Sequence, residues 1–598
     1  MTQPTYIIGI DLGTTNTVVA YTPTGPEPGE QPVIAILEIP QLVGVGVVEQ
    51  RPVLPSFLLL PGGHGVADQN MALPWRQEGG AMVGEFARDR GAELPDRLIS
   101  SAKSWLCHAT VDRTGPILPW QSEIDPGTKL SPVAAASVIL AHVRRSWNDQ
   151  MAVDDHELRL ENQEILLTVP ASFDAVAREL TVKAAEMAGI GNVTLLEEPQ
   201  AAFYAWIHAS GDQWRQQVVK DDQVLVCDIG GGTTDFSLIR ISEQEGQLAL
   251  ERIAVGDHLL VGGDNMDLTL AYAVARQLAA EGKRLDSWQM RGLAHSCRQA
   301  KERLLGDEAI EECPVTILGR GSSLIGGAMR ATLAREMVSD VLVNGFFPEC
   351  ESGATPAGTN RVGIQELGLS YESDPAITHH LAAFLRRNDP LRPTAILFNG
   401  GVMKGAHLRR RVRDILDSWN HSSGSVREIA SENFDLSVAR GAAYYGLARQ
   451  GRGVRIRYGL NRSYYIGIAA SMPAIPGIPA PTKALCIAPF GMEEGSQAHL
   501  QDREFALVVG EVAKFDFLGS PRQNDSFGDI IEDWEGEVQP IAEMETVLDG
   551  EAGAVIPVTL ETRITEVGTL ELWCVAKAGE RRWKLEFNVR EQEPFAVK

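Results

Sequence analysis

Two stretches of this sequence place an acidic residue, glycines and threonines directly after an apolar run. Val224–Leu238 reads VLVCDIGGGTTDFSL, and Tyr6–Ala20 reads YIIGIDLGTTNTVVA. Glycines let a backbone turn approach phosphate oxygens closely, and the exposed N–H groups of such a turn form an anion-binding concavity. One glycine-rich turn after a strand is weak evidence of nucleotide binding. Two copies in one chain indicate duplicated halves that hold a polyphosphate from both sides.

The acidic residues of these stretches suit a metal ion that accompanies phosphate. Asp11 lies in the first stretch, and Asp228 and Asp235 lie in the second. A carboxylate does not bind phosphate, but it can hold a hydrated Mg²⁺ that bridges phosphate oxygens. The sequence therefore predicts a magnesium–phosphate centre between the two stretches.

Two further charged residues have both a functional and an ordinary interpretation. Lys103, in LISSAKSWL, serves phosphate only if its segment folds over the phosphates, and a lone lysine is more often a solvated surface residue. Glu198, in EEPQAAFYAW, could lie beside a metal or a water molecule, but a glutamate at a helix start more often complements the helix dipole. The residues alone leave both alternatives open.

Composition excludes several classes of protein. At 598 residues the chain should hold more than one domain, and its formal net charge of −25 argues against non-specific binding to nucleic acid or to anionic membranes. The seven cysteines include no CxxC pair, which indicates neither a disulfide framework nor a zinc site. No basic leader and no long apolar run is evident, so we expect a cytoplasmic protein without a membrane segment.

Apolar spacing and capping residues predict the elements that position these groups. Helices are expected over Ser131–Trp147, Asp174–Met187 and Leu268–Leu278, from Asp286 with Gln289 as its capping-box partner, and from near Thr332. Strands are expected at Ile165–Val169 and Val193–Leu196, and Ala395–Gly405 (AILFNGGVMKG) reads as a strand, two glycines and a helix start.

The pattern of apolar residues changes after Gln450, from helical spacing to short runs typical of strands. We expect strands at Phe505–Val512, Val555–Ile564, Thr569–Ala576 and Trp583–Val589, and no strong helix. The predicted organisation is an α/β nucleotide-binding domain over residues 1–450, a linker and entry segment over 451–470, and a β-rich domain over 471–598.

The order of these motifs resembles the heat shock protein 70 (DnaK-type chaperone) family of the actin-like ATPase superfamily. The motifs are IGIDLGTTNTVVA, ILLTVPASFDAVARE, LLEEPQAAFYAW, VLVCDIGGGTTDFSL, VGGDNMD, ILFNGGVMKG and SVARGAAYYG, which together span about residues 5–448. The resemblance implies a duplicated actin-like (ribonuclease H-like) ATPase domain of two lobes, followed by a small, mainly β domain that resembles a diverged peptide-binding domain. It also implies ATP or ADP with Mg²⁺ in the cleft, and K⁺ beside them.

The resemblance carries over residue by residue. It implies catalytic roles for Asp11, Lys103, Glu198 and Asp235, and metal-holding roles for Asp11, Asp228 and Asp235. It implies nucleotide contacts for Gly13, Thr14, Thr15, Asn16, Gly230, Gly231, Gly232, Thr233, Gly263, Lys301, Gly400, Gly401 and Asp435. Pro170 and Arg178 match positions that relay nucleotide state between domains.

Several departures from the family pattern accompany the resemblance. Where family members present a Glu, Lys, Arg and Ser series to the adenine, this chain has Arg298, Lys301, Glu302 and Leu305, and Lys404 replaces a partner arginine. The segment GRGVRIR (451–457) replaces a leucine-rich linker, and no helical lid is expected before Lys598.

The leading hypothesis is an ATP-hydrolysing, chaperone-like protein whose partners are unfolded or client polypeptides and co-chaperones. The alternative is a nucleotide-dependent scaffold or filament protein, because the same ATPase fold serves both classes. A sugar or acetate kinase would need a second-substrate motif, and none is evident.

Overall fold

The computed structural model describes a mixed α/β protein. The described residues are 4–25, 32–62, 72–75, 80–108, 111–244, 247–307, 309–317, 329–358, 371–388, 392–420, 424–431, 433–450, 460, 462–469, 482–492, 496–510, 512–520, 525–534, 536, 538–547, 553–565, 570–577 and 581–588. Within these ranges, every helix is too short or too polar to cross a lipid bilayer.

A sheet built around the first glycine stretch forms one half of the fold. Its strand order is β11-β10-β1-β2-β3, and β6 pairs with β2 at one end. The strands are β1 (Tyr6–Leu12), β2 (Asn16–Pro23), β3 (Ala35–Ile36), β6 (Leu54–Pro55), β10 (Glu164–Val169) and β11 (Val193–Glu197). Two amphipathic helices pack on one face, α3 (Pro132–Met151) and α4 (Ala175–Met187). Their predicted caps are present, since Ser131 and Asp174 each accept a hydrogen bond from a first-turn amide.

A sheet of equivalent topology surrounds the second glycine stretch. Its order, β14-β13-β12-β17-β18, repeats the pattern of a central antiparallel hairpin flanked by a parallel strand. The strands are β12 (Gln223–Ile229), β13 (Thr234–Gln244), β14 (Gln247–Val255), β17 (Ala395–Asn399) and β18 (Arg427–Ile429). Helices that share a buried core with this sheet include α7 (Gly263–Ala280), α8 (Ser287–Gly306), α10 (Ile377–Arg387) and α11 (Ala406–Trp419). The expected duplication is therefore visible in the strand order.

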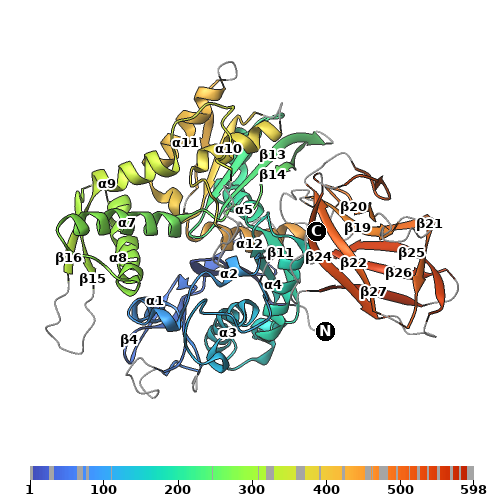
Figure 1. Ribbon diagram of the computed structural model, residues 1–598, viewed down its shortest axis with the longest axis horizontal. Helices are drawn as coiled ribbons and strands as arrows, with labels where there is room; N and C mark the ends of the chain where they lie inside the picture. The colour runs from blue at the N-terminus through green and yellow to red at the C-terminus, as the bar shows by residue number, and fades with distance from the viewer. Residues whose placement is uncertain are drawn as a thin grey trace.

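Two helices join the sheets. The helix α5 (Glu198–Ser210) and the helix α12 (Ser437–Arg449) pack against each other, and both contribute to a core that includes residues of both central sheets. Figure 1 shows them between the strands of the two halves. A Cβ at Gly441 of α12 would overlap the carbonyl oxygen of Ala201 in α5, so this contact requires glycine.

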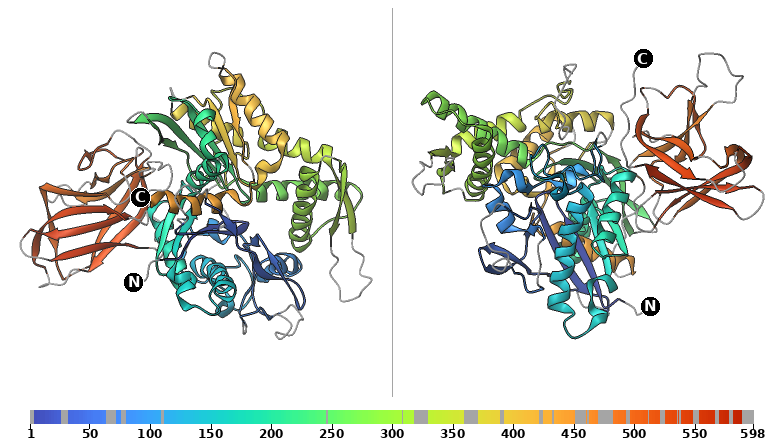
Figure 2. Two further views of the ribbon diagram at one scale, coloured as in Figure 1. Left: turned by 180° about the vertical axis from the view of Figure 1, so that it is seen from behind. Right: turned by 60° about the horizontal axis from the view of Figure 1, so that its bottom comes forward.

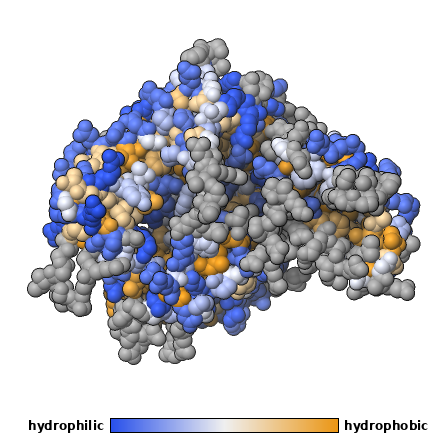
Figure 3. Space-filling model, in the orientation of Figure 1, coloured by the Kyte–Doolittle hydropathy of each residue, from blue (hydrophilic) through white to orange (hydrophobic). Residues whose placement is uncertain are grey.

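Smaller elements extend from the two halves. On the first half they are β4 (Ile39–Gly44), β5 (Val47–Arg51), β7 (Leu58–Leu59), β8 (Met82–Val83), β9 (Leu98–Ile99), α1 (Glu85–Gly91) and α2 (Ala102–Trp105). On the second half they are α6 (Trp214–Gln217), β15 (Glu312–Ile317), β16 (Met329–Ala334) and α9 (Arg335–Ser339). On the face drawn in Figure 3, hydrophobic residues form separate patches among hydrophilic ones.

The remaining strands form a nine-stranded sheet of order β21-β25-β26-β27-β24-β22-β19-β20-β23. They are β19 (Ser463–Ala469), β20 (Thr482–Ala488), β21 (Gln497–Val508), β22 (Val512–Ser520), β23 (Ile530–Ile531), β24 (Gln539–Val547), β25 (Val555–Ile564), β26 (Leu570–Ala576) and β27 (Arg582–Asn588). This sheet lies at the opposite end of the molecule from β15 and β16 (Figures 1 and 2). Tyr464 of β19 is buried in the same core as Phe173 and Ala175, so the sheet packs beside the start of α4.

Three local expectations differ from the structure. The strand predicted over Phe505–Val512 is interrupted at Gly510, whose φ of +84° forms a turn between β21 and β22. Thr332 lies in β16, and the following helix α9 begins three residues later at Arg335. The helix predicted from Leu268 begins earlier, at Gly263. The linker segment 451–459 lies outside the described residues.

The close contact between α5 and α12 makes Gly441 a sensitive position. We expect Gly441→Val to lower the free energy of unfolding by about 3 kcal/mol, because the helices must separate to admit the side chain. Gly292→Val in α8 is the matched control, since a Cβ there meets no atom within 4 Å, and it should change stability by less than about 0.5 kcal/mol. Urea unfolding measures both, and equal effects would contradict the close-packing argument.

Candidate functional site

The turns of the two central hairpins face each other. The amide of Gly13 donates to the carbonyl of Asn16 at 3.0 Å, and the amide of Gly230 donates to the carbonyl of Thr233 at 2.9 Å. A Cβ at Gly231 would overlap the hydroxyl of Thr15, so the Thr15 side chain of the first turn lies against the backbone of the second turn. The Thr15 hydroxyl is buried and has no hydrogen-bond partner. Two glycine turns thus present donors to one space.

That space is a cavity of about 530 Å³ between the two halves. Of the predicted site residues, those that line it are Asp11, Gly13, Thr14, Thr15, Asn16, Lys103, Glu198, Asp228, Gly230, Gly231, Thr233, Gly263, Lys301, Gly400, Gly401 and Asp435. Gly232 and Asp235 do not line the cavity. Its volume is in the range typical of pockets for small molecules and cofactors.

One cation and several carboxylates lie at the base of the cavity. Lys103, which is 7% exposed, forms an ion pair with Glu198 at the first turn of α5. The interpretation of Lys103 as a solvated surface residue is therefore wrong. Ser101, two residues before Lys103, has a φ of 54°. Its hydroxyl donates to Asp264 of α7 at 3.1 Å, which connects the Lys103 segment to the opposite side of the cavity.

The electrostatics of this group are dominated by burial. Burial and the neighbouring charge of Glu198 raise the pKa of Asp11 to about 7 and raise the pKa of Asp228 well above its usual value. Burial alone would lower the pKa of Lys103, but the carboxylates of Glu198 and Asp11 outweigh it and raise that pKa. The site therefore holds more negative charge than Lys103 neutralises, which favours a further cation.

The residues present fit a hydrated metal ion. Within the described part of the chain, no three His, Cys, Asp or Glu side chains converge closely enough to hold an ion directly. Mg²⁺ retains several water molecules in proteins and uses few direct carboxylates, so a dispersed set of acids beside a phosphate cradle suits it.

Asp235 is held behind the cavity wall by two side chains that the sequence analysis missed. The hydroxyl of Ser172 donates to Asp235, and it contacts Nδ1 of His258 at 2.6 Å. The same His258 nitrogen lies 3.6 Å from the Asp235 carboxylate. Burial would lower the pKa of His258, but its interactions with Cys107 and Asp235 raise it well above 6.5. Ser172 lies inside the quoted motif PASFD, but nothing in the sequence pairs it with His258.

Asp228 is also oriented by a residue the sequence analysis missed. The side-chain amide of Asn399, at the end of β17, donates to Asp228 at 2.7 Å. The oxygen of that amide accepts from the hydroxyl of Ser437 at 2.9 Å. The sequence analysis identified residues 395–401 as a strand followed by two glycines. It did not identify Asn399 within this segment as a functional residue.

The basic residues around the proposed nucleoside end of the cavity are paired with carboxylates. Lys301 contacts Asp267 at 2.6 Å, and Arg298 donates to the same carboxylate at 2.7 Å. Lys404 pairs with Asp435 at 2.7 Å. Carboxylates already neutralise part of the charge of these cations. The adenine base of a bound nucleotide would therefore contact ion pairs and not free charges.

A buried ion cluster adjoins the cavity. Glu197, the residue before α5, accepts from Arg178 of α4 at 2.5 Å and pairs with Arg252 of β14. The three side chains are at most 9% exposed. They connect the first sheet, its helix and the second sheet, directly beside Glu198.

Two facing glycine hairpins over an acidic cavity in a mixed α/β chain fit the actin-like ATPase class. Residues 81–353 match the family model of the Hsp70 protein. Over 308 residues the chain is 30% identical to the chaperone protein HscA of Enterobacter sp. (strain 638), which covers 51% of this chain and 43% of the relative. Over 403 residues it is 30% identical to HscA of Salmonella agona (strain SL483), covering 65% and 56%.

The chain is thus similar to the Hsp70 family model over residues 81–353 and to HscA chaperones over about half or more of its length. The chain spans about half the length of the curated relatives it matches, from 43% to 56% in these two cases.

The buried cluster around Glu197 yields a stability prediction. Glu197→Gln should lower the free energy of unfolding by about 3 kcal/mol, because it removes the buried carboxylate charge that two buried guanidinium groups share. Glu281→Gln is the control, since Glu281 is 59% exposed in its pair with Lys283, and it should cost less than about 0.5 kcal/mol. Urea unfolding followed by tryptophan fluorescence tests this, and a neutral Glu197→Gln variant would contradict it.

Proposed function

We propose that this protein binds ATP with Mg²⁺ between its two glycine hairpins, hydrolyses it, and uses the nucleotide state to control polypeptide binding. The observation that carries the proposal is the Lys103–Glu198 ion pair beside Asp11, buried where both phosphate turns converge. The match of residues 81–353 to the Hsp70 family model and the similarity to proteins named as HscA chaperones support it.

The proposed reaction assigns a role to each group. A water oxygen attacks the γ-phosphorus while the bond to the bridging oxygen of ADP breaks, which yields ADP and inorganic phosphate. Glu198 and Asp11 accept hydrogen bonds from the water, and Lys103 stabilises the charge on the phosphoryl oxygens. The hairpin amides and Thr14 and Thr15 hold the phosphates. Asp11 and Asp228 would hold Mg²⁺ through water, the ion would supply further charge stabilisation, and K⁺ is proposed beside it.

Asp235 serves this site indirectly in the proposal. Its carboxylate is fixed by Ser172 and faces His258, so it orients water around the metal from behind the lining residues. Gly263 and Lys301 contact the nucleoside end from one side, and Gly400, Gly401 and Asp435 contact it from the other side. Gly232 keeps the second turn narrow against Thr14.

Coupling to polypeptide would run from the cavity to the C-terminal sheet. Tyr464 is buried near Arg178 and Asp174, and Arg178 pairs with Glu197, the neighbour of Glu198 in the cavity. Pro170 and Arg178 are proposed to relay the nucleotide state along this route. Closure of the two halves on ATP would shift Glu197 and its arginines, and so the surface on which β19 rests. In this proposal residues 1–450 form the two-lobed ATPase domain, 451–470 join it to the sheet, and 471–598 bind client polypeptide, with co-chaperones as further partners.

The function is tested on the full chain. Phosphate release from ATP should require Mg²⁺ and stop with EDTA, and an unfolded polypeptide should stimulate it. Sedimentation of the protein as polymers in ATP, without stimulation by unfolded polypeptide, would favour the filament or scaffold alternative.

The first catalytic prediction concerns the carboxylates. Asp11→Asn and Asp235→Asn should each slow single-turnover hydrolysis about a hundredfold while changing ATP affinity little, because these groups act on water and metal and not on the nucleoside. Asp221→Asn, at an exposed turn, is the control and should be unaffected. Single-turnover rates within about threefold of wild type for both variants would refute the assignment.

The second catalytic prediction concerns Lys103. Lys103→Met keeps the apolar stem of the buried side chain and removes its charge, so hydrolysis should fall about a hundredfold while ATP still binds. Lys283→Met, an exposed lysine, should hydrolyse ATP normally. Calorimetric binding and single-turnover measurements separate the two effects, and normal hydrolysis by Lys103→Met would contradict the proposed role.

A further inference from the structure

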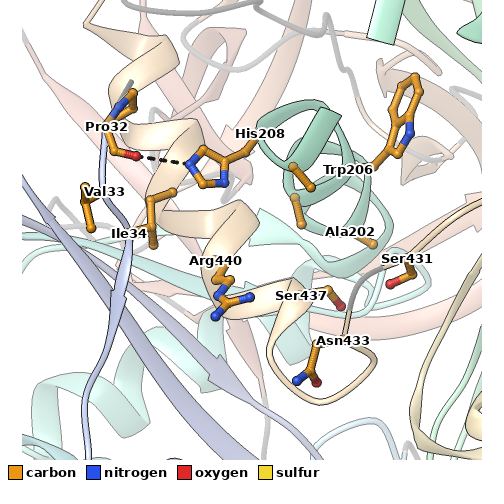
Figure 4. A pocket seen from close by; sticks show the side chains of 12 residues that line it. Pro32, Val33, Ile34, Ala202, Trp206, His208, Ser431, Asn433, Ser437 and Arg440 are labelled. Atoms are coloured by element: carbon orange, nitrogen blue, oxygen red, sulfur yellow. Dashed lines mark hydrogen bonds between the residues drawn. The ribbon is translucent and has the colours of Figure 1, made fainter. Parts of the chain in front are cut away.

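A second cavity lies on the other side of the two joining helices. It has a volume of about 390 Å³ and is walled by residues 32–34, by the second half of α5 and by the start of α12. Figure 4 shows the Arg440 side chain extending from α12 between Ile34 and Ser437. Of the lining residues that the structure describes, none is Asp or Glu.

Among the described residues that line this cavity, Arg440 is the only Lys or Arg, and none of them offers a carboxylate to pair with it. Its Nε is buried and has no hydrogen-bond partner, and no ion pair of its guanidinium occurs among the described residues. The acidic residue closest in sequence, Asp435, pairs instead with Lys404. In a protein of net charge −25, an arginine left unpaired at a pocket wall is available to an external anion.

Further hydrogen-bonding groups surround Arg440. Asn433 uses its side-chain oxygen to accept from the amides of Asp435 and Leu436, at 2.9 and 3.3 Å, which leaves its Nδ2 as a donor towards the cavity. His208 is fixed by contact of its Nε2 with the carbonyl of Pro32 at 3.1 Å, drawn as a dashed line in Figure 4. Buried apolar side chains also line the cavity, among them Ile34 and Ala202.

We propose that this cavity binds a small organic monocarboxylate with an apolar body. One guanidinium matches one carboxylate in a bidentate geometry. A phosphate ester carries close to two negative charges at neutral pH, and the single arginine would leave part of that charge uncompensated in an acidic protein. The apolar wall then covers the hydrocarbon part of the ligand, as in pockets of this size.

The cavity is distinct from the ATP site but adjoins it through one side chain. Ser437 lines it, and the Ser437 hydroxyl donates to Asn399, which in turn donates to Asp228 on the ATP side. The two cavities have no lining residue in common. A carboxylate bound at Arg440 therefore should not compete with nucleotide for space.

The test uses 3-phenylpropionate as the probe and its neutral amide as the matched ligand. Ligand-observed NMR titration of the full chain should detect acid binding, with the amide at least about tenfold weaker. Arg440→Gln should weaken binding of the acid at least about tenfold and leave the amide unchanged. Arg449→Gln, on the same helix but bonded to Thr194, is the control and should bind the acid normally.

A second variant tests the proposal independently, in case Arg440→Gln does not fold. Ala205→Leu fills the cavity from α5 without altering its charge, and it should reduce binding of both ligands. Saturating ADP should leave acid binding in place. The proposal fails if the acid does not bind up to about 10 mM, if Arg440→Gln binds it as wild type does, or if ADP displaces it.

Discussion

The constraint on which this structure depends is the burial of several carboxylates around a single lysine. Asp11, Asp228 and Glu198 lie where two glycine turns meet, and burial raises the pKa of the first two. Such a cluster is unfavourable unless cations are supplied. Lys103 supplies one through its ion pair with Glu198, and a hydrated Mg²⁺ bound with ATP would supply the rest. In the proposed function, this excess of acid favours a polyphosphate that brings a metal ion with it.

The two helices that join the halves both begin at this cavity. The first residue of α5 is Glu198, and α12 starts two residues after Asp435. Each helix then packs on the other through Gly441, where no side chain can intervene. Because close-packed helices transmit displacement and do not absorb it, a change at bound phosphates would, in the proposed function, alter the angle between the halves.

Local patterns in the sequence predicted the parts of the fold that local physics decides. The paired hairpins and the caps at Ser131, Asp174 and Asp286 follow from residues within a few positions of one another, and the structure confirms them. The pairing of Ser172 with His258 and of Arg298 with Asp264 and Asp267 joins segments that no short-range pattern relates. At Gly510, by contrast, a local feature was overlooked. The apolar residues of Phe505–Val512 predicted one strand, but the left-handed backbone of this glycine interrupts it.

The cluster of Glu197 with Arg178 and Arg252 explains why the C-terminal sheet matters to the cavity. A buried ion pair contributes little net stability over an apolar core, so its value lies in fixing one arrangement of the groups it joins. Here it joins the start of α5, α4 and β14, and Tyr464 of the C-terminal sheet is buried beside the same α4. Any movement of Glu198 with nucleotide displaces its neighbour Glu197, and the arginines must follow or lose a charge partner that burial makes indispensable. In the proposed function, the charge cluster would thereby link the position of the sheet to the occupancy of the cavity.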